Sequence, residues 1–393
     1  MKKLAIYGGQ PVRTQLLPYG HQSIDDEDIK AVIEILRTDW LTQGPKIDEF
    51  ERTIANYCGA RYAVAMSSGT AALHAACAAA GISSGDEVIT TPMTFAASAN
   101  AVVYCGGTPV FADILESTFN INPEEIKSKI TSRTRAVLPV DFAGHPVDFD
   151  EIKQIARENQ LIIIEDACHA LGAEYKGEKV GHLSDMTVFS FHPVKHITTG
   201  EGGMVVTDDL NLYEKLKIFR HHGILRNIPG HGGWYYEISE PGYNFRITDF
   251  QCALGISQFK KLDYFISRRK LIAESYNKGF ANLPELILPE EGESVKHAYH
   301  IYVIQLKLDM LKAGRREIFD ALRAENIGVN VHYIPLHFQP FYRDMFHYKE
   351  GDFPKTEMYY TRAITLPVFP AMSDIDIEDV ITAVKKVIEY YRN

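Results

Sequence analysis

Three separate stretches of the chain carry residues whose types could together do chemistry on a bound anion. In Ser67–Thr70, glycine permits close backbone approach, and the amides that follow can bind an anion at a helix N-terminus. The apolar run Leu161–Ile164 leads to Asp166, a carboxylate at the end of a buried strand. In Ser190–Gly203, apolar residues and tight glycines surround Lys195, and loss of water there would lower its pKa and expose a nucleophilic amine.

Each of these features alone has a plainer interpretation. Ser68 and Asp166 are both typical helix N-caps, and a single lysine such as Lys195 is usually a solvated surface charge. The combination is more informative. A phosphate cradle, a carboxylate for a pyridinium nitrogen and a Schiff-base amine are what a pyridoxal phosphate enzyme needs. Neither GxxxxGK[ST] nor an early GxGxxG occurs, which argues against a nucleoside triphosphatase and a Rossmann-type oxidoreductase.

The elements that must position these residues alternate between strand and helix, which predicts a mainly parallel sheet covered on both faces. The expected strands are 62–66, 87–91, 108–112, 134–140, 161–164 and 186–191, with an added hairpin strand at 204–207. The expected helices are 70–80, 95–103, 123–130 and 148–159.

After about Phe250 the pattern changes to that of a smaller α+β domain. A long helix near 252–280 is expected, followed by a strand at 299–306, a helix at 315–325, a strand at 329–332 and a helix at 375–391. We therefore predict a large domain at 1–255, whose N-terminal arm 1–22 could pack elsewhere, and a small domain at 256–393.

Composition restricts the function classes. The chain has 393 residues, which suggests about two domains, and 41 basic against 51 acidic residues give a net charge of −10. This balance argues against nucleic-acid binding. No apolar run approaches the ~20 residues of a membrane span. The five cysteines form no CxxC pair, so no disulfide framework or metal site is expected, and we predict a cytoplasmic protein.

Five motifs, in order along the chain, resemble those of the DegT/DnrJ/EryC1/StrS family of sugar aminotransferases. They are Ser68-Gly69-Thr70, Glu165 to Ala170, Ser190 to Gly203, Gly242 to Arg246 and Val331-His332-Tyr333. The resemblance extends from Leu41 to Pro370. It implies an α/β fold of type I among pyridoxal phosphate-dependent transferases, similar to aspartate aminotransferase, with a large domain and a smaller C-terminal α+β domain.

The resemblance also implies roles around the cofactor, pyridoxal 5'-phosphate. Lys195 would be the Schiff-base lysine and Asp166 the partner of the pyridine nitrogen. The phosphate would be held by Gly69, Thr70 and Ser190, and from the partner subunit by Asn244, so the active unit would be a homodimer with shared active sites. Ser68 would also bind the cofactor. Phe95 would stack on the ring, for which a core aromatic is the plain alternative, and His169 would lie beside the ring or its phenolic oxygen.

The substrate contacts that the resemblance implies are spread along the chain. They are Tyr19, Trp40, Leu41, Thr42, Ser68, Ser190, Asn244, His332, Tyr333 and Ile334. Turn and packing roles are the alternative for these residues, above all for Leu41 and Ile334. Arg220, His221, His222 and Arg246 are candidate partners for a diphosphate or carboxylate, and surface solvation is their alternative.

The reaction implied is amination of C4 of a UDP-linked 4-keto-6-deoxy-hexosamine, as in pseudaminic acid biosynthesis, with glutamate as donor. Some relatives carry histidine in place of the lysine and become dehydratases. Here Lys195 stands at that position and His196 only follows it, which favours transamination. A UDP-4-keto-pentose or another nucleotide-linked keto sugar is the alternative substrate. A non-catalytic regulatory protein that keeps the fold is the alternative outside this class.

Overall fold

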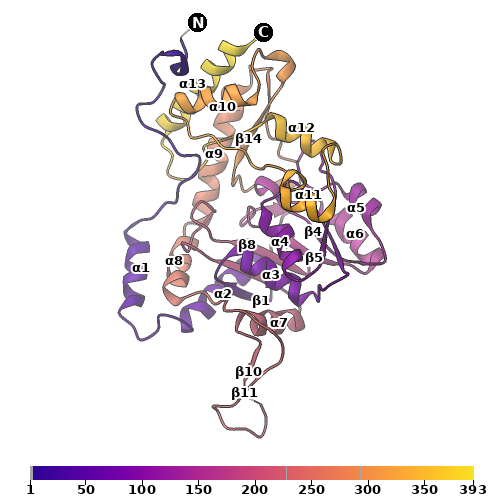
Figure 1. The fold of residues 1–393 in the computed structure, drawn as a ribbon. Helices are drawn as coiled ribbons and strands as arrows, with labels where there is room; N and C mark the ends of the chain where they lie inside the picture. Colours follow the sequence, from indigo (N-terminus) through magenta and orange to yellow (C-terminus); the bar gives the residue numbers. More distant parts are fainter. Residues whose placement is uncertain (1–2, 227, 293) are drawn as a thin grey trace.

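A seven-stranded sheet forms the centre of the molecule (Figure 1). The computed structural model describes residues 3–226, 228–292 and 294–393. All strands of this sheet except β9 run in the same direction, and β9 is antiparallel to both of its neighbours. This confirms the mainly parallel sheet and the added hairpin strand. The spatial order is β1 (Tyr62–Met66), β9 (Gly203–Thr207), β8 (Met186–Ser190), β5 (Ile162–Asp166), β4 (Thr134–Leu138), β2 (Glu87–Thr90) and β3 (Thr108–Phe111).

Helices cover both faces of this sheet, because successive strand residues point to opposite sides. Val64 and Met66 of β1 pack toward one group of helices, and Ala63 and Ala65 of the same strand pack toward the other. The first group is α3 (Gly69–Ala79), α4 (Ala96–Tyr104) and α7 (Leu210–Arg220). The second is α2 (Pro45–Cys58), α5 (Pro123–Lys129), α6 (Phe149–Asn159), α8 (Asp249–Phe259) and the start of α9 (Leu262–Phe280).

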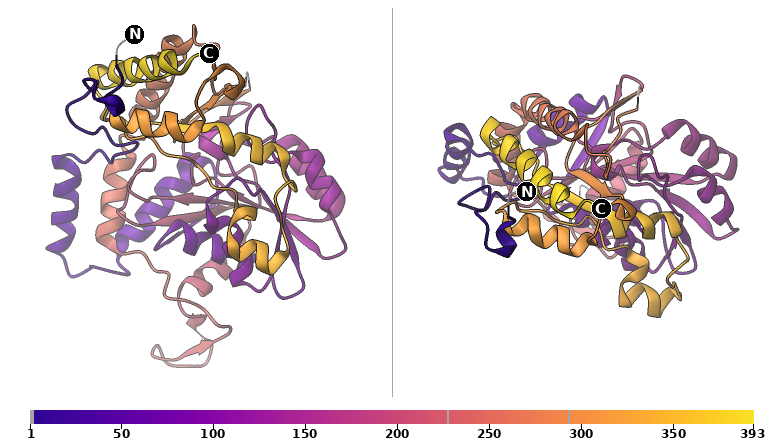
Figure 2. Two further views of the ribbon diagram at one scale, coloured as in Figure 1. Left: turned by 45° about the horizontal axis from the view of Figure 1, so that its top comes forward. Right: turned by 90° about the horizontal axis from the view of Figure 1, so that it is seen from above.

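The C-terminal part of the chain builds a second, smaller layer beside the first (Figure 2). Its antiparallel sheet consists of β12 (Leu286–Ile287), β14 (Tyr302–Leu306) and β15 (Ala363–Leu366). The rest of α9, α10 (Arg315–Ala324) and α13 (Asp374–Tyr391) pack around it. Leu4 and Leu17 belong to the same core, so the N-terminal arm packs with the C-terminal part of the chain. The division into domains at residue 255 stays a prediction.

Two expected elements differ in the structure. The expected helix at 252–280 is two helices, α8 and α9, separated at Lys260 and Lys261. Lys261 instead forms ion pairs with Asp25 and Asp28 beside α1 (Asp26–Leu36), which the sequence patterns did not predict. The expected strand at 329–332 is an irregular segment with a single bridge from Asn330 to Thr365, because β15 occupies the place beside β14.

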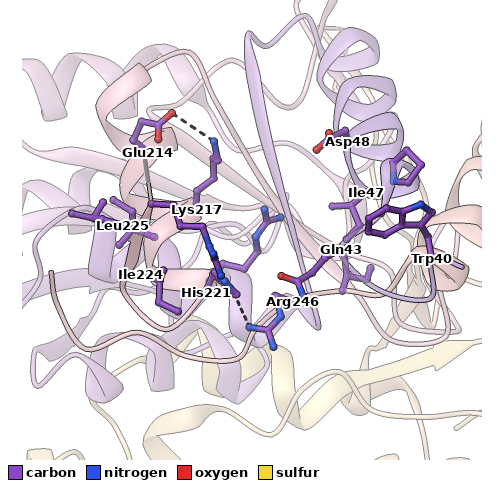
Figure 3. Close-up of a pocket in the computed structure, with 16 residues that line it drawn as sticks. Trp40, Gln43, Ile47, Asp48, Glu214, Lys217, His221, Ile224, Leu225 and Arg246 are labelled. Atoms are coloured by element: carbon purple, nitrogen blue, oxygen red, sulfur yellow. Dashed lines mark hydrogen bonds and ion pairs between the residues drawn. The ribbon is translucent and has the colours of Figure 1, made fainter. Parts of the chain in front are cut away.

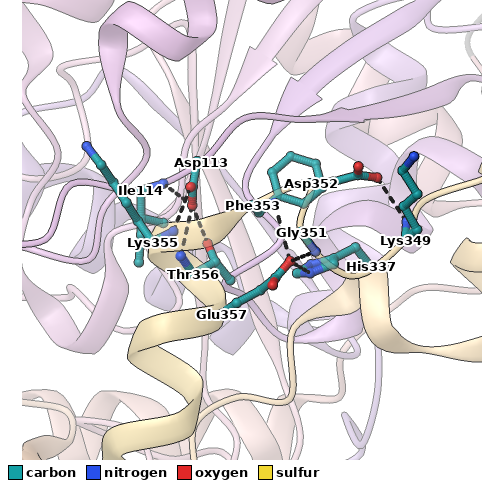
Figure 4. Close-up of polar contacts among 10 residues, drawn as sticks. All are labelled: Asp113, Ile114, His337, Lys349, Gly351, Asp352, Phe353, Lys355, Thr356 and Glu357. Atoms are coloured by element: carbon teal, nitrogen blue, oxygen red, sulfur yellow. Dashed lines mark hydrogen bonds and ion pairs between the residues drawn. The ribbon is translucent and has the colours of Figure 1, made fainter.

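The remaining elements connect or extend these layers. A small sheet joins β6 (Glu174–Tyr175), β7 (Glu178–Lys179) and β13 (Val295–Lys296), and the hairpin of β10 (Ile224–Arg226) and β11 (Tyr236–Ile238) projects from the large layer (Figure 1). The segment with α11 (Pro340–Phe346) and α12 (Pro354–Arg362) returns along the large layer. There Asp113, just after β3, accepts hydrogen bonds from the first turn of α12 (Figure 4). No helix of the described ranges is long and apolar enough to cross a bilayer.

Candidate active site

The carboxyl ends of β5 and β8 border a cavity of about 540 Å³. Asp166 is the last residue of β5 and Ser190 the last residue of β8, and these strands are parallel neighbours. Parallel strands end at the same edge of a sheet, where α/β proteins bind ligands. The cavity wall contains most of the expected site residues: Tyr19, Ser68, Gly69, Thr70, Phe95, Asp166, His169, Ser190, Lys195, His332 and Tyr333.

Lys195 reaches this cavity from the turn that follows β8. Its Nζ atom lies 3.4 Å from Nε2 of His300. Burial among protein atoms lowers the pKa of Lys195, Cys168 and Asp166 oppose this shift, and the positive charge of Arg269 adds to it. An amine with a lowered pKa is uncharged in a larger fraction of molecules, and the uncharged form is the nucleophile.

Asp166 is held by two hydrogen bonds. The hydroxyl of Ser98 on α4 donates to Oδ2 at 2.6 Å, and the backbone N–H of Cys168 donates to Oδ1 at 3.2 Å. Thr94 shares a hydrogen bond of 2.7 Å with Ser98, which fixes that hydroxyl in turn. The carboxylate is therefore oriented at the cavity wall, where it can pair with a protonated nitrogen of a ligand.

The start of α3 forms a cradle for an anion. The Ser68 hydroxyl accepts a hydrogen bond from the N–H of Ala71, so it caps the helix while it lines the cavity. Within the described ranges, no hydrogen bond occupies the N–H groups of Gly69 and Thr70. A Cβ on Gly69 would lie 3.1 Å from Oγ of Ser190, so glycine allows the helix and the strand end to approach this closely. Two free amides and the Ser190 hydroxyl suit a phosphate group.

Aromatic side chains form the opposite wall. The Phe95 side chain is 61% exposed, and its ring centre lies 6.1 Å from that of Tyr333. The Tyr333 hydroxyl shares a hydrogen bond of 3.1 Å with Nε2 of His169, whose Nδ1 is buried without a partner. His332 bonds to the Thr365 hydroxyl through Nδ1 at 2.9 Å and packs against the ring of Tyr19. This wall offers an uncovered aromatic face and free polar atoms to a flat, polar ligand.

Five of the expected residues lie outside this cavity in the single chain. Ile334 is exposed next to Tyr333 and does not line the cavity. The other four, which are also exposed, gather near a second groove of about 660 Å³ (Figure 3). They are Trp40, which lines the groove, Leu41, Thr42, which bridges to Thr248, and Asn244, which bridges to His221 in the groove wall.

This second groove carries excess positive charge. Arg226 and Arg246 line it, and Arg246 donates a hydrogen bond to Nδ1 of His221 at 2.7 Å. Arg220 also contributes, but it is paired with the buried Glu51 at 2.6 Å, so it stabilises the wall. The exposed Arg226 and the half-buried Arg246 make the groove suitable for an anion.

Three residues at the main cavity were missed by the sequence patterns. Ser98 supports Asp166, and His300 contacts Lys195. Arg269 of α9 is buried behind them and donates to the backbone oxygens of Val194 and His300. Thr94 and Ser98 are four residues apart at the start of a helix, and this spacing could have indicated that both hydroxyls lie on the same face of the helix. Nothing near Arg269 or His300 in the sequence indicated a site.

The residues at the cavity fit pyridoxal phosphate. Free amides and hydroxyls suit its phosphate, the oriented Asp166 suits its ring nitrogen, and Lys195 supplies an amine of lowered pKa. The exposed Phe95 ring suits the plane of the cofactor, and the unpaired Nδ1 of His169 can serve a polar ring substituent.

Comparison with known proteins agrees with this fit. The model of the DegT/DnrJ/EryC1/StrS aminotransferase family matches residues 22–385. The chain is 49% identical to the protein MJ1066 of Methanocaldococcus jannaschii over 97% of this chain and 100% of that protein. It is 44% identical to the spore coat polysaccharide biosynthesis protein SpsC of Bacillus subtilis, over 96% of this chain and 98% of that protein.

A solved structure shows the same fold. PseC of Helicobacter pylori, an aminotransferase involved in the biosynthesis of pseudaminic acid, superimposes with a TM-score of 0.90 at 32% identity, covering 96% of this chain and 100% of that one. The fold type I architecture and the cofactor expected from the sequence are thereby confirmed. The chain is a pyridoxal phosphate-dependent sugar aminotransferase and belongs to the DegT/DnrJ/EryC1/StrS aminotransferase family.

Proposed function

We propose that the protein transfers an amino group from glutamate to C4 of a UDP-linked 4-keto-6-deoxy-hexosamine, as in pseudaminic acid biosynthesis. The observation that carries this proposal is the presence of Lys195 and Asp166 in one cavity, beside the free amides of Gly69 and Thr70. The similarity to PseC supports the choice of sugar. The cavity of about 540 Å³ accommodates a small ligand.

The residues of the cavity divide the work of two half-reactions. Pyridoxal phosphate, when bound, supplies an electron sink for the negative charge that develops on the reacting carbon. Lys195 would hold the cofactor covalently. When its amine is released, Nζ would take a proton from the carbon that bears the donor's amino group, and in the second half-reaction it would return one to C4 of the sugar. Asp166 would keep the ring nitrogen protonated, and Gly69, Thr70 and Ser190 would hold the phosphate.

A direct assay tests the reaction. The purified protein, loaded with cofactor, is incubated with ¹⁵N-glutamate and the UDP-4-keto-6-deoxy-hexosamine, and the ¹⁵N-amino sugar is measured by mass spectrometry. We expect transfer that requires both substrates and that Lys195→Ala abolishes together with the covalent attachment of the cofactor. Cofactor binding without transfer to any nucleotide-linked keto sugar would refute the proposed substrate class.

A second candidate substrate has its own support. The identity to SpsC, 44%, exceeds the identity to PseC, and SpsC takes part in spore coat polysaccharide biosynthesis. Another nucleotide-linked 4-keto sugar, or a UDP-4-keto-pentose, is therefore the alternative acceptor. Parallel assays with each keto sugar decide between them, because a specific site distinguishes acceptors by kcat/KM.

We further propose that the active unit is a homodimer in which the second groove of one subunit completes the cavity of its partner. Four of the five expected residues that lie outside the cavity, Trp40, Leu41, Thr42 and Asn244, gather, exposed, at this groove. Arg226 and Arg246 would then provide positive charge for the diphosphate of the nucleotide. Asn244 would reach the cofactor phosphate of the partner, as the family resemblance implies.

Mixing two impaired variants tests this arrangement. In a mixed dimer, Lys195→Ala and Asn244→Ala fall in the same active site if Asn244 acts on the partner, which leaves the other site intact, and they damage one site each if both residues serve their own subunit. After unfolding and refolding a 1:1 mixture, we expect about a quarter of the wild-type activity, because a mixed dimer keeps one intact site. Activity no higher than the mean of the two separate variants would refute the shared site.

A further inference from the structure

A group of histidines lies around the amine of Lys195, and the resemblance to the family assigns only some of them. His300 precedes β14 and is buried. Its ring centre lies 4.3 Å from that of His169 and 5.7 Å from that of His196. Of these three rings, only that of His300 contacts Nζ of Lys195, at 3.4 Å from Nε2.

The backbone holds His300 firmly in this place. Its N–H donates to the oxygen of Ala143 at 2.9 Å, and its own oxygen accepts from Arg269 at 3.0 Å. Arg269 also donates to the oxygen of Val194, the residue before Lys195, at 3.3 Å. One buried guanidinium thus ties the backbone of His300 to the backbone that carries Lys195. The imidazole itself is free to serve the amine, because its Nδ1 has no partner among the described residues.

Charge determines the direction of the contact. Burial and the nearby Lys195, His169, His196 and Arg269 hold the pKa of His300 well below its ordinary value, so the ring is neutral at neutral pH. A lysine ammonium has only donors, and a neutral imidazole has one acceptor nitrogen. Nε2 must therefore be the acceptor when Lys195 is charged, and Nδ1 then carries the proton.

We propose that His300 is a positioning residue that accepts a hydrogen bond from the ε-amine of Lys195 and holds this amine at the cavity wall whenever the amine is not covalently bound. The proposal rests on the proposed role of Lys195 as the residue that binds the cofactor and moves protons. Without this contact the released amine would be free to rotate away from the reacting carbon, and the proton transfers would slow. His300 acts through Lys195 and takes no direct part in making or breaking covalent bonds.

The contact can be measured without cofactor or sugar. Cofactor-free protein is acetylated with limiting acetic anhydride over a series of pH values, and the Lys195 peptide is quantified by mass spectrometry to obtain the pKa of this amine. In His300→Phe, which keeps the ring volume, the ammonium loses its acceptor. Loss of a hydrogen bond to a charged group changes an equilibrium constant by about tenfold. Here the equilibrium is the protonation of the amine, so the pKa of Lys195 should fall by about one unit.

Other charged and titratable groups also face the amine, and His300→Phe leaves all of them in place. They are Asp166 and Cys168 at the end of β5, Arg269 on α9, and the neighbouring His169, His196 and His332. His196→Gln is the matched control, because His196 is an equally buried ring whose Nε2 bonds to the oxygen of Ala298 instead. This variant should leave the pKa of Lys195 unchanged.

Two amide variants keep the test decisive if the phenylalanine variant does not fold. In His300→Gln the side-chain oxygen can reach the place of Nε2, so this variant should keep the wild-type pKa of Lys195. In His300→Asn the shorter amide reaches only the place of Nδ1, so this variant should behave like His300→Phe. An unchanged or raised pKa in both His300→Phe and His300→Asn would overturn the proposal.

The loaded enzyme gives a second readout. We expect kcat to fall about tenfold in His300→Asn, the KM for the sugar to change less than about twofold, and His300→Gln to recover most of the loss. If kcat fell equally in His300→Gln and His300→Asn, and in proportion to a loss of thermal stability, His300 would have only a structural role. Failure of Lys195→Ala to abolish cofactor attachment would instead refute the role of Lys195, and acetylation of the cofactor-free protein does not depend on that role.

Discussion

Two buried polar clusters of this molecule both contain acidic side chains and histidines, but they differ in how fully the protein itself pairs these groups. One surrounds the cavity at the end of β5, with Lys195, Asp166, His169 and His300. The other joins the end of β3 to the segment of α12, with Asp113, His337 and Glu357 (Figure 4). We call the second cluster the α12 clasp.

In the α12 clasp, the protein itself satisfies the carboxylates. Asp113 accepts from the N–H groups of Ile114, Lys355 and Thr356 and from the Thr356 hydroxyl, at 2.7–3.0 Å. Glu357 accepts from Nε2 of His337 at 3.0 Å and from the N–H of Gly351 at 2.8 Å. These bonds use both oxygens of Asp113 and Oε1 of Glu357, so the cluster stabilises the contact of α12 with the large sheet.

At the cavity, polar capacity is left open. The N–H groups of Gly69 and Thr70 and the Nδ1 atoms of His169 and His300 have no partner among the described residues, and Lys195 has one long contact. Unpaired buried polar groups cost stability, so a ligand that pairs with them binds well. His337 also has an unpaired Nδ1, so the difference lies in the whole set of groups and not in one atom.

The largest expected effect is at the cavity, where a substitution should lower kcat strongly and change the free energy of unfolding little. Lys195→Ala should reduce kcat by more than about 10³-fold, because in the proposed function Lys195 is both the nucleophile and the proton carrier. The free energy of unfolding should change by less than about 1 kcal/mol, since among the described residues the amine of Lys195 makes one long hydrogen bond. Steady-state assays and urea unfolding measure the two quantities.

The exposed Lys30 on α1, paired at 3.9 Å with Glu34, provides the control for loss of a lysine. Lys30→Ala should leave both kcat and stability nearly unchanged. If Lys195→Ala instead unfolded the protein, the cavity would be as structural as the clasp, and the comparison between them would fail.

The opposite result is expected at the α12 clasp. Asp113→Ala leaves three backbone N–H groups and a hydroxyl without their acceptor, so the free energy of unfolding should fall by about 3 kcal/mol. The kcat of the folded enzyme should stay within about threefold. Urea unfolding and assays below the unfolding transition measure both.

Asp113→Asn is the matched variant, because its amide oxygen still accepts while its NH₂ faces other donors. We expect it to lose a smaller amount of stability than Asp113→Ala. A kcat that fell in parallel with stability in both variants would show that the clasp transmits its state to the cavity.

The large sheet and the main residues of the cavity could be predicted from the sequence. Strands that alternate with helices impose the parallel order, and parallel order brings Asp166 and Ser190 to one edge. The cradle at Gly69 and Thr70 could be predicted because it is formed within one short segment. These inferences needed only local pattern and one topological rule.

The supporting residues could not be predicted, since they come from distant segments. Ser98 is 68 residues from Asp166 in sequence, and His300 is 105 residues from Lys195. The hydrophobic pattern specifies which face of an element is buried but not which atom of another element it meets there. The same limit explains the misplaced strand at 329–332, where Val329 is buried in the small-layer core but a single bridge, from Asn330 to Thr365, joins the segment to β15.

Protonation of the histidines at acid pH should reduce the stability of the protein more at the cavity than at the α12 clasp. Burial lowers the pKa of His332 at the cavity to about 4, with a contribution from Lys195. The unfolded chain takes up this proton near pH 6.5, and the folded protein does not until about pH 4. Stability is therefore fully present above about pH 6.5 and is lost as the pH falls toward 4, by about 3 kcal/mol for this group.

His337 in the clasp should contribute less to this loss. Burial lowers its pKa as well, but the nearby Glu357 carboxylate opposes the shift. Urea unfolding at pH 7 and pH 5 should thus show a smaller acid loss in His332→Gln than in wild type, and a weaker improvement in His337→Gln. Equal improvement in both variants would contradict the difference between the clusters.

The smallest expected effect concerns the support of Asp166. Ser98→Ala removes the donor to Oδ2, so the carboxylate loses its fixed orientation, and we expect kcat to fall about tenfold with a stability loss of about 1 kcal/mol. Ser184→Ala is the matched control: this hydroxyl donates at 2.8 Å to Glu165, the neighbouring residue of β5, which lies outside the cavity wall. It removes an equivalent hydrogen bond to a carboxylate on the same strand, so it should reduce stability by a similar amount without lowering kcat. Equal kcat in the two variants would mean that Asp166 needs no support, and that its position at the strand end alone orients it.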